Sequence, residues 1–273
     1  MPGGGRRPVS PRGRMPVLFV GHGSPMNAIE DNEFSRGWKK IAREVPRPEA
    51  ILCVSAHWET AGVLVTGMEK PPTIHDFAGF PRELFEVGYP APGSPWLPQE
   101  TIGLVRKAAV GIDRAWGLDH GCWSVLRQMY PAADIPVVQL SLDTSQPGQF
   151  HYDLARELAP LRDKGVLILA SGNIVHNLRR ISLPKSGSFN DRYGLPWALE
   201  ASALVKSLID TGAHDELIDY RSLGAAVQLA VPTPEHYLPL LYALALKDKE
   251  EAISYFNDEA VAGSLTMTSL VVQ

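Results

Sequence analysis

The chain has 273 residues, of which 45% are hydrophobic and 21% are charged, and its formal net charge is −4. A chain of this length and hydrophobicity can bury a substantial core, and we expect one large domain. The slightly acidic balance argues against a nucleic-acid partner, because such proteins normally carry a clustered excess of Lys and Arg. Apolar runs such as Val166–Ala170 are strand-sized, far below the roughly 18–20 residues of a membrane span, so we expect no membrane partner.

The N-terminal residues 1–14 form a Gly- and Pro-rich arm with four arginines. Because this arm lacks the apolar segment of a signal peptide, we expect it to be disordered, with the folded domain spanning residues 15–273. The two cysteines, Cys53 and Cys122, have neither the spacing of a disulfide framework nor that of a zinc site. We therefore expect reduced, structural thiols and a cytoplasmic location.

From Pro16 onward, short β-branched runs alternate with stretches of helical periodicity, a pattern typical of a sheet with helices on its faces. The expected fold class is α/β, a single domain with a central mixed or mostly parallel sheet flanked by helices. The predicted strands are Val17–Val20, Ile51–Ser55, Val63–Thr66, Val137–Ser141, Val166–Ala170 and Leu265–Val271. The predicted helices are Phe34–Glu44, Gln99–Val110, Cys122–Met129, Tyr152–Arg162, Trp197–Asp210 and Glu235–Leu246.

Polar residues directly follow three of the predicted strands. They form the clusters Gly21-His22-Gly23-Ser24, Ala56-His57-Trp58 and Ser171-Gly172-Asn173. In open α/β sheets, ligands bind in a crevice at the carboxyl ends of the strands, so we expect the functional site there. The aperiodic segment Pro71–Pro98 is too long for a simple connection, which predicts a loop that covers this crevice.

His22 and His57 are the first candidate metal ligands. His22 lies between two glycines directly after a strand, where the backbone can turn sharply and direct the imidazole into the crevice. His57 lies at the end of a second strand. Most histidines face water or form hydrogen bonds inside the protein, but the position of these two at strand ends favours metal binding.

Two further histidines lie in comparable positions. His176 follows the third strand end, and Asn177 beside it can orient the ring by hydrogen bonding. His236 follows Thr233 and Pro234, which resemble the N-cap and the first residue of a helix. Glu235 then falls in the first helical turn, where a carboxylate often serves only to balance the helix dipole.

The other histidines fall into two groups. His120 precedes a helix and is a candidate acid/base or substrate-orienting donor, and His75 lies in the loop segment, from which it can reach a substrate. His151 and His214 lie at polar helix starts, and we expect both to face solvent. The ligand candidates suit one divalent ion, Zn²⁺ or Fe²⁺, since neutral imidazole binds both and leaves the charge of the ion available for an anionic substrate. These candidates are His22, His57, His176 and His236.

The order, spacing and flanking residues of six motifs resemble the 4,5-DOPA extradiol dioxygenase family, the single-chain branch of the class III ring-cleaving dioxygenases in the LigB-like superfamily. The resemblance runs from about Met15 to the C-terminus. The motifs are Gly21-His22-Gly23-Ser24-Pro25-Met26, Ser55-Ala56-His57-Trp58, Pro72-Thr73-Ile74-His75-Asp76-Phe77, Asp119-His120-Gly121, Ser171-Gly172-Asn173 with His176-Asn177-Leu178, and Pro232-Thr233-Pro234-Glu235-His236-Tyr237-Leu238-Pro239-Leu240.

The resemblance implies an extradiol dioxygenase that uses O₂ to open the ring of a catechol such as DOPA beside its hydroxyl groups. It carries over His22, His57 and His236 as metal ligands, with His176 either a fourth ligand, as with Zn²⁺, or the acid/base. Glu235 competes with His236 for the third position, because many class III relatives use two histidines and a glutamate. His176 or His120 would supply protons during cleavage, and His75 and Tyr237 would contact the substrate. We expect a monomer or a small homo-oligomer.

Two alternatives use the same histidines differently. In a zinc hydrolase, Zn²⁺ would lower the pKa of a bound water to about 7 and create a nucleophile without redox chemistry. In a non-catalytic binding module, the ion would be structural, although structural zinc sites are usually closed and rich in cysteine. Metal content and oxygen uptake distinguish the dioxygenase from these two alternatives.

Overall fold

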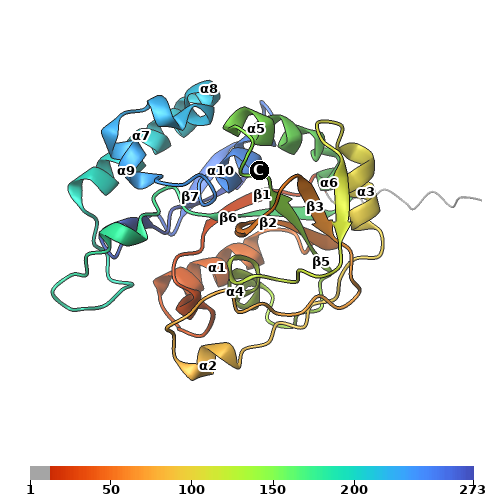
Figure 1. The fold of residues 1–273 in the computed structure, drawn as a ribbon, viewed down its shortest axis with the longest axis horizontal. Coiled ribbons are helices and arrows are strands. Elements are labelled where there is room, and N and C mark those ends of the chain that lie inside the picture. The colour runs from red at the N-terminus through yellow and green to blue at the C-terminus, as the bar shows by residue number, and fades with distance from the viewer. Residues whose placement is uncertain (1–12) are drawn as a thin grey trace, which may run out of the picture.

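The computed structural model describes residues 13–273, and within this range an eight-stranded sheet forms the centre of the protein (Figure 1). Its strand order is β4-β3-β5-β2-β6-β1-β10-β7. The pairs β1–β6, β2–β6, β2–β5 and β3–β4 are parallel, whereas β10 pairs antiparallel with β1 and β7, and β3 with β5. The predicted single-domain α/β fold with a mixed, mostly parallel sheet is confirmed.

The strands of the central sheet are β1 Val17–Gly21, β2 Ala50–Glu59, β3 Val63–Thr66, β4 Val110–Asp113, β5 Val137–Leu142, β6 Val166–Gly172, β7 Ile253–Phe256 and β10 Ser269–Val272. A separate small ribbon pairs β8 Ala260–Val261 with β9 Leu265–Thr266. The inner strands are buried on both faces, and their side chains alternate between two hydrophobic clusters. Val17 and Phe19 of β1 thus pack on one face, and Leu18 and Val20 on the other.

Helices cover both faces of the sheet. The cluster that contains Phe19 is covered mainly by α5, α7, α9 and α10, and the cluster that contains Leu18 is covered by α1 and α4 (Figure 1). The α-helices are α1 Glu33–Glu44, α2 Arg82–Phe85, α3 Leu97–Leu104, α4 His120–Met129, α5 Gly148–Glu157, α6 Pro160–Asp163, α7 Pro196–Thr211, α8 His214–Ile218, α9 Ala225–Ala230 and α10 Leu238–Ala245. Short 3-10 helices are η1 Pro25–Ala28, η2 Leu178–Arg180 and η3 Tyr220–Ser222. No helix in the described range is long and apolar enough to cross a membrane.

Five predicted elements differ clearly from the structure at their boundaries. The predicted strand 51–55 is β2, which extends to Glu59, so His57 lies within the strand and not after its end. The predicted helix 99–110 ends at Leu104, and Val110 begins β4, which we did not predict. The predicted helix 152–162 is divided into α5 and α6 because Pro160 has no N–H to continue the first helix. The predicted strand 265–271 is two strands, β9 and β10, and the helix predicted from Glu235 begins at Leu238.

The solvent-facing position predicted for His151 is wrong. Its side chain is fully buried, and its ring nitrogens lie 3.1 Å from the Tyr242 hydroxyl and 3.0 Å from the Asp143 carbonyl oxygen. Burial lowers the pKa of His151 to about 4, so the ring is neutral inside the domain. His214 is half-buried and lies 2.7 Å from the Tyr152 hydroxyl.

Of the arm expected over residues 1–14, only Gly13 and Arg14 lie within the described range. Arg14 forms ion pairs with Asp163 and Asp248 beside the start of the domain. The two cysteines are both buried and unbridged, as the sequence predicts. Neither contributes to a possible metal-binding group among the described residues.

Candidate metal centre

Three neighbouring strands bring the first site residues together. In the sheet, β6 lies between β1 and β2, and all three strands are parallel, so their carboxyl ends lie at the same edge. Their registers align Gly21 of β1 with Gly172 of β6, and Ser55 of β2 with Ser171 of β6. His22 and His57 therefore meet at this edge, as predicted, with their Nε2 atoms 3.1 Å apart.

The backbone around His22 needs glycine on both sides. A Cβ on Gly21 would lie 2.6 Å from the carbonyl carbon of Met267, and Gly23 has a φ of +58°, a conformation that side chains with a Cβ rarely adopt. Close packing and the left-handed turn together direct the His22 side chain inward, where it is 2% exposed. The glycines thus explain why the histidine is buried at a strand end.

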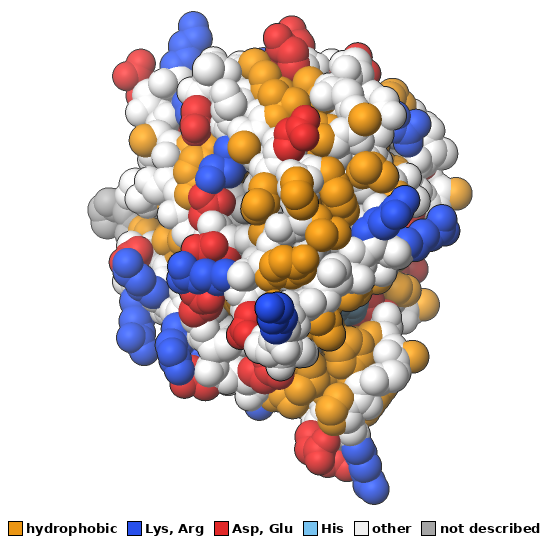
Figure 2. Space-filling view, turned by 90° about the vertical axis from the view of Figure 1, so that its left-hand side faces the viewer, with side chains coloured by type: hydrophobic (Ala, Val, Ile, Leu, Met, Phe, Trp, Pro, Cys, Tyr) orange, Lys and Arg blue, Asp and Glu red, His pale blue; other side chains and the backbone are white. Residues whose placement is uncertain are grey.

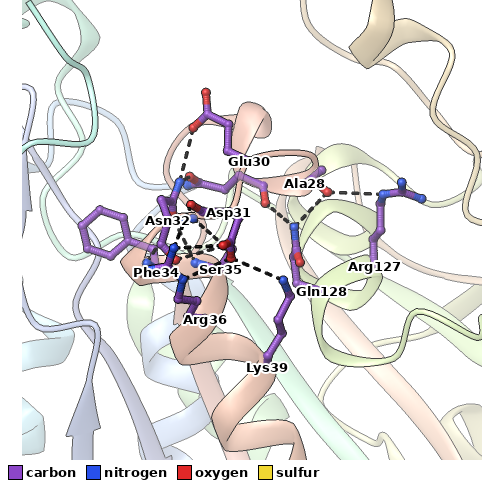
Figure 3. A network of polar contacts seen from close by, with 11 residues as sticks. Ala28, Glu30, Asp31, Asn32, Phe34, Ser35, Arg36, Lys39, Arg127 and Gln128 are labelled. Carbon is purple, nitrogen blue, oxygen red and sulfur yellow. Dashed lines mark hydrogen bonds and ion pairs between the residues drawn. The ribbon is translucent and has the colours of Figure 1, made fainter.

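A hydrogen-bond network in the next segment holds the His22 loop in place (Figure 3). Asn27 of η1 donates its Nδ2 to the carbonyl oxygen of His22 at 3.2 Å. Gln128, on α4, donates its Nε2 to the carbonyl oxygens of Asn27 and Ala28 at 2.7 and 2.9 Å. Arg127 donates its Nε to the Ala28 carbonyl at 3.2 Å. The position of His22 is therefore coupled to α4, which also carries His120.

The tautomer of His22 follows from Ser171. The Ser171 hydroxyl donates its single hydrogen to the Gly121 carbonyl oxygen at 2.6 Å, so it accepts a hydrogen bond from His22 Nδ1 at 3.0 Å. His22 then carries its proton on Nδ1, and the lone pair of Nε2 faces the crevice. This is the arrangement of a histidine that is ready to bind a metal ion.

His236 has the same tautomer for a different reason. Its Nδ1 lies 3.0 Å from Glu235 Oε1, a carboxylate oxygen that can only accept, and Thr233 donates its hydroxyl to the same oxygen at 2.8 Å. The Nε2 of His236 is buried, and no hydrogen-bond partner is found for it among the described residues. A buried polar atom without a partner is costly, and here it points to a missing ligand.

His57 provides the third candidate donor nitrogen, after His22 and His236. Its Nδ1 lies 3.4 Å from Asp76 Oδ2, so the carboxylate favours the proton on this nitrogen and leaves the Nε2 lone pair facing His22. Two lone pairs 3.1 Å apart repel each other unless a cation lies between them. Imidazole nitrogens about 2.0–2.1 Å from one tetrahedral zinc ion would be roughly 3.3 Å apart, so the observed separation fits a shared metal ion.

Burial keeps all three rings neutral. It lowers the pKa of His22 and His236 well below the usual range and, together with the nearby His120, that of His57 to about 3. Neutral histidines offer lone pairs to a metal without competition from protons. One donor atom each from His22, His57 and His236 lies within 4.8 Å of the others, and these residues form the candidate metal centre.

His176 lies against this group in a different orientation. Its ring is stacked on the ring of His236, with centroids 3.4 Å apart and planes 8° from parallel. Because a ring nitrogen directs its lone pair within the ring plane, parallel stacked rings direct their lone pairs along separate planes. The donor atoms of His176, Glu235 and His236 also lie within 4.8 Å of one another. Burial lowers the pKa of His176 to about 4, so its ring is neutral beside the candidate metal centre.

The family model described as the catalytic LigB subunit of aromatic ring-opening dioxygenase matches residues 16–269. The chain belongs to this family. It is therefore an aromatic ring-opening dioxygenase, an oxidoreductase whose family is metal-dependent, and the hydrolase alternative is not favoured. The resemblance noted in the sequence is confirmed.

Relatives of this dioxygenase cover nearly its whole length. It is 48% identical over 263 residues to the 4,5-DOPA dioxygenase extradiol of Escherichia coli (strain K12), with 95% of each chain covered. It is 40% identical over 235 residues to the 4,5-DOPA dioxygenase extradiol of Beta vulgaris, covering 84% of this chain and 85% of that protein. A crystal structure of an uncharacterised protein from Escherichia coli K12 superposes with a TM-score of 0.81 at 43% identity, covering 95% of this chain and all of that one.

Two of the predicted substrate-binding residues lie outside the histidine cluster of the dioxygenase. Tyr237 is fully buried, its hydroxyl donates to the Leu217 carbonyl oxygen at 3.0 Å, and its ring packs against Tyr220. The hydroxyl hydrogen of Tyr237 is thus used inside the protein, and its contact with a substrate stays a prediction. His75 is half-buried, and its Nε2 donates to the Val87 carbonyl oxygen at 2.9 Å.

The loop predicted to cover the crevice reaches the site through Asp76 and Phe77. The ring of Phe77 lies 5.5 Å from that of His120 and forms an aromatic group with its neighbours Phe80, Phe85 and Trp123. His120 is buried at the start of α4, where Asp119 caps the helix by accepting from Cys122 N at 3.1 Å. Aromatic and ionisable side chains therefore adjoin the metal centre on this side.

Sequence reasoning missed Asp76 and Ser171 as site residues. Both lie inside the quoted motifs, but an aspartate next to a histidine and a serine at a strand end are common. Their importance depends on histidines 19 or more positions away in the chain, which only the fold brings near. Glu235, left undecided by the sequence, lies on His236 Nδ1 rather than on Nε2.

Proposed function

We propose that this dioxygenase opens the ring of a catechol such as DOPA beside its hydroxyl groups, with one divalent metal ion held by His22, His57 and His236. The observation that supports this most strongly is that donor atoms of the three rings lie within 4.8 Å of one another while each Nδ1 has its own polar partner. Each has an acceptor at Nδ1, namely Ser171, Asp76 and Glu235, so each directs the lone pair of Nε2 toward one point. In this proposal Glu235 orients His236 and is not itself a ligand.

We infer that the working ion is Fe²⁺. Imidazole ligands bind both Fe²⁺ and Zn²⁺, but Fe²⁺, when bound, supplies the redox chemistry that O₂ requires and Zn²⁺ lacks. Three neutral ligands leave the positive charge of the ion uncompensated, and this charge favours a deprotonated catechol over the neutral form. Zn²⁺ would fit the same residues as an inactive substitute.

Two histidines would move the protons. His176 is neutral and stacked against His236, so it can accept a proton from a catechol hydroxyl at the mouth of the site. The Nδ1 of His120 lies 3.0 Å from Asp76 Oδ2, and this contact orients the ring. We therefore assign the role of base to His176 and that of proton donor during ring cleavage to His120.

The surroundings suit a planar aromatic substrate. Phe77 presents its ring edge-on to His120, and aromatic walls favour stacked or edge-on contacts with another ring. Figure 2 shows hydrophobic side chains gathered on the face that includes α7 and α9. The exposed residues of this kind on or near those helices are Leu178, Ile181, Leu183, Leu199 and Leu229. His176 immediately precedes this apolar surface in the chain.

The names of the relatives narrow the substrate class. Proteins 48% and 40% identical to this chain are called 4,5-DOPA dioxygenase extradiol, so DOPA is the first catechol to test.

We also propose a cytoplasmic location, because both buried cysteines are unbridged. A monomer or a small homo-oligomer remains our prediction for the assembly.

Oxygen uptake tests the proposal. Metal-free protein is reconstituted with Fe²⁺ without air, and oxygen consumption is recorded with L-DOPA and a panel of other catechols. We expect one O₂ consumed per ring opened with Fe²⁺ and none above background with Zn²⁺. Full iron loading without oxygen uptake on any catechol would overturn the proposed function.

A further inference from the structure

Asp76 lies between two histidines of the site, accepts a hydrogen bond from the backbone of one and lies close to the Nδ1 atoms of both. Its Oδ2 lies 3.0 Å from His120 Nδ1 and 3.4 Å from His57 Nδ1, and its Oδ1 accepts from the backbone N of His120 at 2.9 Å. The side chain is 17% exposed, so little water competes for it. One carboxylate from the loop thus joins β2 to the start of α4.

A carboxylate suits this place because it can only accept. An ionised Asp has two acceptor oxygens and no hydrogen to donate, which matches the backbone N–H of His120 that donates to it and the Nδ1 atoms of His57 and His120, both of which can donate. The isosteric amide of Asn would place an NH₂ against at least one of them. The geometry therefore selects for charge and not only for size.

We propose that Asp76 is a positioning residue that fixes the tautomers of His57 and His120 at the same time. By holding the proton of His57 on Nδ1, it makes Nε2 available to the metal ion of the proposed function, on which this inference rests. By holding a proton on His120 Nδ1, it directs Nε2 of that ring toward the crevice. One side chain thus aligns a metal ligand with a proton donor.

A competing role for Asp76 is that of a metal ligand. His57, Asp76 and His120 offer donor atoms within 4.8 Å of one another, a set of two histidines and a carboxylate that iron also accepts. That use would need the lone pair of His57 Nδ1, which is lost once Nε2 binds an ion and the proton occupies Nδ1. We therefore assign Asp76 to hydrogen bonding.

The variants Asp76→Asn and Asp76→Ala separate these roles. The full-length protein is stripped of metal, and Zn²⁺ affinity is measured by competition with a chelator. We expect Asp76→Asn to weaken Zn²⁺ binding about 10- to 100-fold and to be more harmful than Asp76→Ala, where water can replace the lost acceptor. A purely structural side chain would show the reverse order, because Asn keeps the shape and Ala leaves a gap.

Histidine tautomers give a readout that does not depend on activity. Nitrogen NMR of the metal-free protein with ¹⁵N-labelled histidine should show His57 protonated on Nδ1 in the wild type and shifted toward Nε2 in Asp76→Asn. Asp113→Asn is the matched control, because the Asp113 carboxylate accepts from the backbone N atoms of Ala115 and Trp116. That variant should leave Zn²⁺ affinity and the histidine signals unchanged.

The outcomes distinguish this inference from the proposed function. Unchanged Zn²⁺ affinity and tautomers in Asp76→Asn would overturn the positioning role, whatever the enzyme does with oxygen. Two Zn²⁺ ions per wild-type chain, falling to one in Asp76→Ala, would make Asp76 a ligand and also overturn it. Tight Zn²⁺ binding that depends on Asp76, without oxygen uptake after iron loading, would refute only the dioxygenase proposal.

Discussion

Ser171 determines which ring nitrogen of His22 is available to bind a metal ion. The Ser171 hydroxyl is committed to the Gly121 carbonyl oxygen, and for that reason it must accept from His22 Nδ1. Hydrogen-bond partners of metal-binding histidines fix ring orientation and tautomer, and their loss typically weakens metal binding about 10- to 100-fold. Ser171 therefore contributes to the site without touching the ion.

We predict that Ser171→Ala weakens Zn²⁺ binding by about this factor while the protein stays folded. The measurement is a chelator competition on metal-free protein, with circular dichroism to confirm the fold. Ser124→Ala is a suitable control, because Ser124 is also fully buried and no partner for its hydroxyl is found among the described residues. Equal affinity in Ser171→Ala and the wild type would show that His22 does not need this hydrogen bond.

At the scale of residues, the sequence predicted the clustered histidines better than the side chains that hold them in place. The carboxyl ends of parallel strands converge, so a histidine directly after a predicted strand is a good candidate for the site. This position identified His22 and His57 in the sequence. Ser171, Asp76 and Glu235 act through polar contacts with histidine rings, and the direction of such a contact depends on other partners, such as the Gly121 carbonyl oxygen for Ser171. The spacing of residues in the sequence does not show which other partners these side chains have.

Among the elements, α4 links the His22 loop to His120. The helix starts with His120 and, eight residues later, carries Gln128, which holds the carbonyl oxygens of Asn27 and Ala28 (Figure 3). These two carbonyl groups belong to η1, directly after the His22 turn. Packing of η1 on α4 thus fixes the position of His22 relative to His120.

We predict that Gln128→Leu lowers the free energy of unfolding by about 1–3 kcal/mol, because carbonyl groups buried without a donor carry that cost. Urea denaturation of the metal-free protein measures it. Arg36→Ala removes an exposed contact with Asp31 in the same region and should cause no measurable change. A Gln128 variant as stable as Arg36→Ala would show that the network does not support the loop.

The predicted boundaries are wrong where contacts with a neighbouring segment outweigh the local sequence pattern. Residues 105–110 continue a helical pattern, but the backbone N atoms of Arg106 and Lys107 bind the Glu157 carboxylate and the chain then enters β4. Thr233 and Pro234 resemble a helix start, yet the Thr233 hydroxyl binds Glu235, and the regular helix starts at Leu238. Contacts with α5 and within the site determine these boundaries.

At the scale of the whole molecule, the order of the strands in the sheet brings the site residues together. The order β2-β6-β1 places Ser171 between His57 and His22, and residues 232–237 then bring His236 against β6, where its carbonyl oxygen accepts from Asn173 N at 2.8 Å. The alternating pattern of strands and helices predicted the α/β class. It could not predict that β1 pairs with β10 at the other end of the chain, because strand pairing depends on packing and not on local sequence.

The central claim is that one ion is held by three histidines and that His176 serves as a base. Metal-free wild type and the variants His22→Ala, His57→Ala, His236→Ala and His176→Ala are titrated with Co²⁺, and the stoichiometry is read from the absorption of the bound ion. We predict one ion per chain in the wild type and in His176→Ala, and none in the other three variants. Loss of the ion in His176→Ala to the same degree would contradict the account and make His176 a fourth ligand.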